Sequence, residues 1–336
     1  MRKLISVLLA MALMLSMAAC APAAAPEAGK QPDAPSAPPA ETSASGEELP
    51  YIPVIALGFG HQFWQAVKMG AEQAAKEYGV QITFEGPETE TMVDKQVDML
   101  KTALSKNPVA VCLAAIDNEA VAADLKAAKE KGIKVVGFDA GCGELADTHC
   151  STSNYDAGVL AAENAARLMN ETGVVAVVGH SQTVVDAVAR VEGFVDTIKE
   201  KYPNMSIADI QYGEGDHLKS ADIAKSMMTA HPEIGLIYAS NEGACVGAYN
   251  GLKEINKIGQ VKLIGFDSSA AMKDAIRKGE ISGAITQDPV GMGYKSVEAA
   301  VKLVRGETVD PVIDTGCYWY DATNMDAAHI APLLYD

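Results

Sequence analysis

The segment KVVGFDAG, residues 134–141, returns with small changes as KLIGFDSS, residues 262–269. Each is an apolar, strand-like run that ends in Gly-Phe-Asp, and the two aspartates, Asp139 and Asp267, lie 128 positions apart. This spacing is about the size of one α/β domain, so the repeat predicts two domains of similar topology. Ligands of open parallel sheets bind at the carboxyl ends of the strands, where both aspartates stand. The repeat therefore predicts a cleft between two such ends.

Short runs rich in Val and Ile alternate with longer amphipathic stretches from Ile52 onward. This alternation predicts an α/β fold, with doubly wound parallel sheets that helices cover on both faces. Helices are expected to end at the glycines 79, 132 and 279. The expected strands are 52–57, 80–85, 109–114, 133–138, 174–178, 206–211, 234–239, 261–266, 281–286 and 311–315.

Residues 1–19 have the features of a secretory signal peptide. Two basic residues precede an apolar run that is too short for a comfortable membrane span. The run ends in MAAC, which resembles the lipoprotein motif in which Cys20 is lipidated; plain secretion is the alternative. Residues 20–50, rich in Ala, Pro, Ser and Glu, predict a disordered tether. We expect an exported protein, lipid-anchored to the outer face of the cell membrane or periplasmic.

The net charge of −17 argues against nucleic-acid partners, which require basic faces. Five cysteines remain once Cys20 is assigned to the lipid. Cys142 and Cys150 would allow a disulfide in an oxidising compartment, whereas Cys112 and Cys245 lie in apolar segments typical of a core. The spacing of Cys142, His149 and Cys150 matches no common zinc signature, so no metal site is predicted.

Two segments imitate enzyme motifs. The loop GFGHQF, residues 58–63, begins like the dinucleotide fingerprint but carries Phe63 where the third glycine is needed. The segment GHSQT, residues 179–183, resembles a nucleophile elbow but ends in Thr183, and no glycine-rich oxyanion loop precedes it. Asp267 and His329 could be named as triad partners, but any long chain offers such pairs. We predict that the protein is not an enzyme and needs no cofactor.

Phe63 and Trp64 lie at the carboxyl end of the first expected strand. Packing into the core is one interpretation of this pair. The other is a ligand site, since aromatic faces at the carboxyl end of a strand can stack on a sugar ring while neighbouring polar groups bind its hydroxyls. Their position favours the ligand site.

Many segments, in order and spacing, resemble the type 1 periplasmic binding proteins of the ribose and galactose class, the receptors of sugar ABC transporters. The similarity rests on HQFWQAVKMGAEQAAKEYG, AAIDNEAVAADLKAAKEKGIKVVGFD, RVEGF, TAHPEIGLIYASNEGACVGAYNGL, KLIGFDSSAAM and GAITQDPVGMGY. The resemblance implies two doubly wound, Rossmann-like domains joined by a three-strand hinge, which close over one small molecule. The implied lobes are 51–154 with 288–316 and 155–287 with 317–336.

The resemblance also implies the ligand contacts. Phe63 and Trp64 would sandwich the ligand, and polar groups would bind it at His61, Asp139, Asn241, Asp267 and Gln287. Four further polar residues, on loops that would face the cleft, are His180, Gln182, Asp186 and Asp216.

Several positions depart from the family pattern. The two arginines by which ribose receptors hold the sugar fall on Ala140 and Val188, the second aromatic wall falls on Gly215, and a cleft asparagine falls near Ala114. Arg190 is retained, at a position that the resemblance implies to be structural. These departures argue against ribose and favour a larger ligand.

The predicted function is capture of a small polyhydroxylated ligand, a sugar, by a monomeric receptor that delivers it to an ABC permease. One alternative is a ligand sensor, of the autoinducer or chemoattractant type, that docks on a membrane receptor; another is a receptor for a non-sugar solute. A sugar-responsive repressor would need a DNA-binding amino terminus, where a signal segment stands instead. The sequence assigns no role to Cys317 or to the aromatic tail near Trp319.

Overall fold

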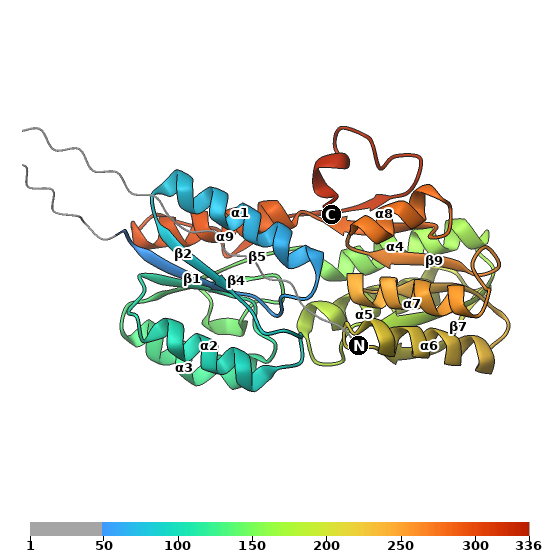
Figure 1. Cartoon of the computed structure of the whole chain (residues 1–336), viewed down its shortest axis with the longest axis horizontal. Helices are drawn as coiled ribbons and strands as arrows, with labels where there is room; N and C mark the ends of the chain where they lie inside the picture. Colours follow the sequence, from blue (N-terminus) through green and yellow to red (C-terminus); the bar gives the residue numbers. More distant parts are fainter. Residues whose placement is uncertain (1–48, 336) are drawn as a thin grey trace, which may run out of the picture. The chain divides into compact units, whose positions relative to one another are not determined.

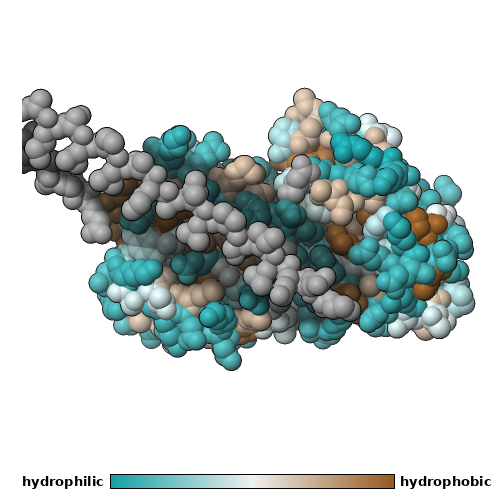
Figure 2. Space-filling view, viewed as in Figure 1, coloured by the Kyte–Doolittle hydropathy of each residue, from teal (hydrophilic) through white to brown (hydrophobic). Residues whose placement is uncertain are grey.

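The computed structural model of the chain describes residues 49–335. The expected signal peptide, Cys20 and nearly all of the expected tether lie outside the described residues. Within residues 49–335, no helix combines the length and the apolar character that crossing a bilayer requires. Hydrophilic residues predominate on the face seen in Figure 2, in keeping with the net charge of −17.

The first sheet has six parallel strands in the order β11-β5-β4-β3-β1-β2. Helices α1 and α9 cover one face, and α2 and α3 cover the other (Figure 1). Because both faces are covered, central strands such as β3 are buried at every position, as their unbroken apolar runs predict. The bounds are β1 Tyr51–Ile55, α1 Gln62–Tyr78, β2 Gln81–Glu85, α2 Val93–Leu104, β3 Ala110–Leu113, α3 Asn118–Glu130, β4 Lys134–Phe138, β5 Thr148–Ser151, α9 Pro289–Val304 and β11 Val312–Asp314.

The second sheet repeats this plan in the order β12-β10-β9-β8-β6-β7, with only its edge strand β12 antiparallel. Helices α4 and α5 pack on one face, and α6, α7 and α8 pack on the other. The bounds are α4 Asn154–Met169, β6 Gly173–Gly179, α5 Val185–Lys201, β7 Met205–Tyr212, α6 His217–Ala230, β8 Ile234–Ala239, α7 Glu242–Glu254, β9 Lys262–Phe266, α8 Ala270–Arg277, β10 Gly283–Gln287 and β12 Cys317–Tyr320. Two short 3₁₀ turns lie at Gly143–Leu145 and Ala331–Leu333.

The chain passes between the sheets three times, from β5 to α4, from β10 to α9 and from β11 to β12. The predicted fold class, two doubly wound α/β halves joined by three crossings, is confirmed. All the expected strands are present, with ends shifted by up to two residues. The three expected helix-ending glycines have positive φ angles of 68°, 82° and 72°.

Two strands were not predicted. β5, THCS, has no apolar run; it pairs with β4 and β11, and Cys150 alone of its residues belongs to the apolar core. β12, CYWY, was read as a crossover of unknown direction; it turns back after Gly316 and pairs antiparallel with β10. The cysteines of the described residues are all free, so the disulfide considered between Cys142 and Cys150 is not formed.

Helices α1 and α9 pack at backbone contact, and Gly293 makes this approach possible. A Cβ atom at position 293 would lie 2.0 Å from the carbonyl oxygen of Val67. We therefore expect Gly293→Ala to push the helices apart and to lower the free energy of unfolding by about 1–3 kcal/mol. Urea denaturation measures this loss. Val304→Ala, at an exposed position of the same helix, is the control and should change it by less than about 0.5 kcal/mol. Equal stabilities would contradict the packing argument.

Candidate ligand-binding cleft

The aspartates of the two Gly-Phe-Asp segments occupy equivalent places in the two sheets. Asp139 follows β4 and its N–H donates to Cys150 O of the neighbouring strand at 3.0 Å; Asp267 follows β9 and donates to Ile285 O at 2.7 Å. Both have left-handed backbones, with φ of 52° and 72°. Non-glycine residues rarely adopt this conformation, and it collects at functional sites. The internal repeat thus extends from sequence to backbone geometry.

One cleft brings most of the predicted contacts together. Of the eleven predicted ligand contacts, nine line it, and its two unanticipated polar members are Glu90 and Arg190. The lining comes from both sheets. It consists of Leu57, His61, Phe63, Trp64, Glu90, Asp139, His180, Asp186, Arg190, Asn241, Asp267 and Gln287.

Asp267 is held in place by its neighbours. Its Oδ1 accepts from Gln287 Nε2 at 2.7 Å, its Oδ2 accepts from the N–H of Glu242 at 3.3 Å, and its backbone carbonyl accepts from the hydroxyl of Tyr320 at 2.8 Å. Burial raises the pKa of its carboxyl, although the charge of Arg190 opposes the shift. The strand β12, which carries Tyr320, thus supports the loop that presents Asp267.

Asn241 has a structural role in addition to the predicted ligand contact. Its Oδ1 accepts from the N–H of Ala244 at 2.8 Å and so caps α7. Because that oxygen is used, the amide nitrogen is the group that Asn241 offers to the cleft.

Phe63 and Trp64 are both buried, with 5% and 2% of their surface exposed, and their rings pack edge to face at 4.9 Å. They also line the cleft. The two interpretations of this pair are therefore compatible, since side chains that close the core of the first half also form one wall of the cleft.

Glu90 is the central polar residue of the cleft, and sequence reasoning missed it. Its Oε1 accepts from Trp64 Nε1 at 2.7 Å and lies 3.1 Å from Nδ1 of His61. Its Oε2 lies 2.9 Å from Nε2 of His180, a residue of the second half. Burial would raise the pKa of Glu90, but the two histidines hold it well below its usual value. Glu90 stands in a loop without periodicity; the available signal was that this loop follows the carboxyl end of a strand.

His61 is charged in this arrangement. Its Nδ1 faces the Glu90 carboxylate and its Nε2 lies 3.1 Å from Gly215 O, so both ring nitrogens face acceptors and both must carry protons. Burial opposes the charge, but Glu90 outweighs it and raises the pKa of His61 to about 10. A Cβ atom at Gly215 would lie 3.1 Å from the His61 ring, which explains why no aromatic wall stands at this position.

Further contacts join the halves around this cluster. Glu242, at the start of α7, accepts from the N–H of Phe63 at 3.2 Å. Burial raises its pKa to about 7, against the opposing charge of His61. Together with the bonds from His61 to Gly215 and from Glu90 to His180, this contact closes the cleft.

Stability should depend on the pH through His61. Its folded pKa is raised above 6.5, so its contribution is complete below about pH 6.5 and is lost as the pH rises through about 10. Glu90→Gln removes the charge that raises this pKa, and we expect the variant to lose less stability between pH 7 and 10 than the parent. Urea denaturation across this range measures the difference. Glu88→Gln, in the same loop but exposed, is the control and should follow the parent; parallel curves for all three would contradict the assignment.

Asp186 and Arg190 face the cleft from one helix, α5. Their ion pair measures 3.2 Å from Asp186 Oδ2 to Nη2 of Arg190. Arg190 also donates to Asn154 Oδ1 at 2.8 Å and to Ser240 O at 3.2 Å, and its guanidinium lies 3.9 Å from the centroid of the Phe266 ring. These bonds hold Arg190 in the second half, and the side chain also lines the cleft.

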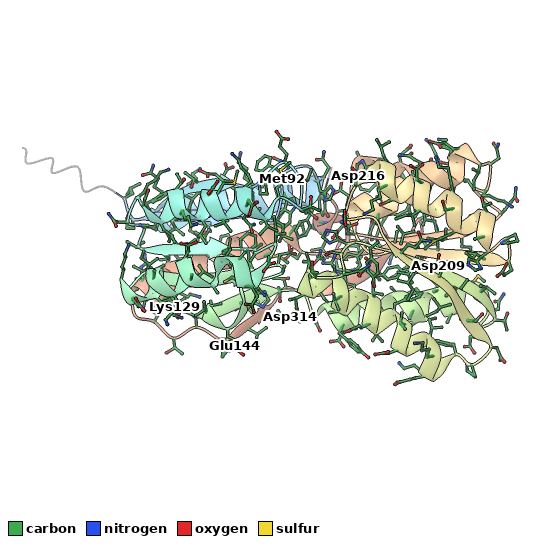
Figure 3. The ribbon with its side chains drawn as sticks, turned by 90° about the horizontal axis from the view of Figure 1, so that it is seen from below. Met92, Lys129, Glu144, Asp209, Asp216 and Asp314 are labelled. Atoms are coloured by element: carbon green, nitrogen blue, oxygen red, sulfur yellow. The ribbon has the colours of Figure 1, made fainter. Side chains whose placement is uncertain are left out.

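The remaining predicted residues lie elsewhere. Asp216 caps α6 by accepting from the N–H of Lys219 at 2.7 Å, and Figure 3 shows it where α6 begins. It lines an outer cavity of about 480 Å³, which shares His61 and Glu90 with the cleft. Gln182 lines a separate surface pocket beside β7. Ala140 and Val188 are absent from the lining of the cleft. The ligand roles of Asp216 and Gln182 remain predictions.

The elbow-like segment is a structural turn. The hydroxyl of Ser181 accepts from the N–H groups of Thr183 and Val184, at 3.1 and 3.2 Å, and so forms the turn that precedes α5. Its neighbour His180 faces Glu90 and not the serine.

The cleft is closed. The space that it offers to water is about 20 Å³, far below the ~300–1,000 Å³ of typical ligand sites. Glu90 and His61 line both the cleft and the outer cavity, and Glu90 contacts His180 of the other half. A ligand can enter only if the halves separate or these side chains move.

Comparisons with known proteins agree with this geometry. Residues 52–308 match the model of the periplasmic binding protein domain. The D-ribose/D-allose-binding protein of Pseudomonas aeruginosa is 23% identical over 83% of this chain and 91% of its own length. The carbohydrate transporter solute-binding protein of Agrobacterium radiobacter, solved with D-arabinose, is 28% identical, with a TM-score of 0.81 over 86% of this chain and all of that one. A solute-binding protein of Agrobacterium vitis, solved with D-fucose, has the same identity and TM-score over 85% of this chain and all of that one.

Proposed function

Because the chain belongs to the periplasmic binding protein family, we propose that it is the solute receptor of an ABC importer for sugars. The observation that carries this proposal is the cleft itself, where carboxylates, amides and an aromatic pair from both sheets converge. Carboxylates and amides bind vicinal hydroxyls in pairs, and aromatic faces stack on sugar rings. The relatives that bind ribose, arabinose or fucose support the ligand class.

The proposed mechanism is closure of two lobes over the ligand. We propose that the lobes are residues 51–154 with 288–316 and residues 155–287 with 317–336, and that the three crossings act as the hinge. A ligand that contacts both lobes shifts the population from open to closed, because those contacts exist only in the closed form. The closed receptor then docks on a permease. No chemical step is involved, so no turnover of the ligand is expected.

We propose that Phe63, Trp64, Asp139, Asp267 and Gln287 contact the ligand. The outer cavity supports a ligand larger than a pentose, since its volume of about 480 Å³ adjoins the cleft. The removal of Glu90 and His61 from the mouth of the cleft would join the two spaces. Export through the predicted signal peptide and anchoring through Cys20 complete the proposal, and mass spectrometry of the purified protein tests the lipid directly.

Thermal unfolding tests the function. The purified chain is heated with pentoses, hexoses, disaccharides, polyols, nucleosides and amino acids in turn. At a concentration a hundredfold above its dissociation constant, a true ligand stabilises by about 2.7 kcal/mol, which shifts the melting temperature by several degrees. Stabilisation by sugars supports the proposal. Stabilisation by amino acids or nucleosides alone would mean that the protein is a solute receptor whose ligand is not a sugar.

A further inference from the structure

The cleft is lined by more acidic than basic side chains. Glu90, Asp139, Asp186 and Asp267 line it, and Glu242 adds a fifth carboxyl group at the N–H of Phe63. The basic side chains that face these groups are Arg190, His61 and His180. The carboxyl groups therefore outnumber the basic side chains by five to three.

Among these groups, Asp139 and Asp267 form no ion pair. Glu90 is bonded to both histidines, and among the carboxylates Arg190 bonds only Asp186. Burial and the neighbouring charge of Asp186 raise the pKa of Asp139 well above its usual value, and burial raises the pKa of Asp267. The charge of Arg190 opposes both shifts but does not cancel them.

Two buried acceptor atoms of the cleft have no donor. Asp186 uses Oδ2 for Arg190 and leaves Oδ1 unpartnered, with 6% of the residue exposed. Gln287 uses Nε2 for Asp267 and leaves Oε1 unpartnered, with 1% exposed. A buried acceptor without a partner is costly. Both atoms belong to residues that line the cleft, where a bound ligand can supply the donors.

We propose that the ligand of this cleft is an amino sugar, a polyhydroxylated ring that carries a protonated amine, and that Asp186 selects for the amine. The inference rests on the proposed sugar-receptor function. An ammonium group brings three donors and no acceptor, together with a positive charge for the two aspartates that form no ion pair. A neutral hydroxyl supplies one donor, brings acceptors of its own and supplies no such charge.

Matched pairs of ligands test this proposal. Glucosamine, galactosamine and mannosamine are each titrated against the full chain by calorimetry at pH 6.5, beside the parent hexose and the N-acetyl derivative. At least one amino sugar is expected to bind about tenfold or more tightly than its parent, which corresponds to about 1.4 kcal/mol. The N-acetyl derivative keeps the nitrogen but not the charge, and it should lose the advantage. The advantage should also shrink with added salt.

A variant of Asp186 tests whether this residue causes the preference for amino sugars. Asp186→Asn keeps the shape and removes the charge, and the ratio of the two affinities, amino sugar to parent hexose, should fall toward one. Asp196→Asn is the matched control, because Asp196 lies on the same helix but bonds the exposed hydroxyl of Tyr155; its ratio should equal that of the parent chain.

The two possible failures are distinct. Neutral hexoses that bind as tightly as their amino counterparts would overturn this proposal and leave the sugar receptor intact. If neither the neutral hexoses nor the amino sugars bind, both the proposed sugar-receptor function and the amino-sugar proposal are wrong.

Discussion

Replacing Arg190 by alanine is expected to lower the free energy of unfolding by about 3–5 kcal/mol. The side chain is 3% exposed and bonds Asp186, Asn154 and the carbonyl of Ser240 while its guanidinium stacks on Phe266. Its removal leaves the carboxylate of Asp186 buried without its cation and opens a void beside the ring. Chemical denaturation of the ligand-free protein measures the loss.

Two further variants test whether the buried network of Arg190 causes this loss of stability. Arg190→Lys keeps the charge but not the planar fork of donors, so its stability should fall between those of the parent and of Arg190→Ala. Arg277→Ala removes an exposed arginine whose ion pair with Asp326 lies on the surface, and it should cost about 1 kcal/mol or less. If Arg190→Ala cost no more than Arg277→Ala, the buried network would not hold the second half together.

Replacing Asp267 by asparagine is expected to weaken ligand binding by about 30-fold or more, which corresponds to about 2 kcal/mol. The carboxylate lies on the cleft with its two oxygens oriented by Gln287 and by the N–H of Glu242. Asparagine tolerates the left-handed backbone at φ 72° better than most residues, so the change removes the charge and one of the two hydrogen bonds that the carboxylate accepts without straining the backbone. Calorimetric titration with the ligand found by thermal unfolding gives the loss.

The equivalent change in the other half, Asp139→Asn, should also weaken binding, because the repeat puts both aspartates at the same place in their sheets. Asp274→Asn, on an exposed face of α8 and paired with Lys278, is the control and should bind like the parent. Unchanged affinity in both Asp267→Asn and Asp139→Asn would show that the two aspartates do not contribute to ligand binding.

The candidate site was predictable where it depends on strands. Residues that directly follow a strand, such as Asp139 and Asp267, could be assigned to the cleft because the carboxyl ends of parallel strands meet at one edge of a sheet. Residues of long loops could not. Asp216 and Gln182 were expected at the cleft from their loops, but they lie in neighbouring cavities, since loop backbones follow no period that fixes the direction of a side chain.

The sequence by itself determined the two α/β halves, because unbroken apolar runs can be buried only in sheets covered on both faces. It also determined the paired aspartates, through the repeated Gly-Phe-Asp. Only the tertiary structure decided that Glu90 lies between His61 and His180, and that Asp186 Oδ1 remains without a donor. Glu90 and His180 belong to different sheets, and their 2.9 Å contact depends on how three chain crossings bring those sheets together. No local pattern encodes such a distance, because it is the sum of many packing contacts along the chain between them.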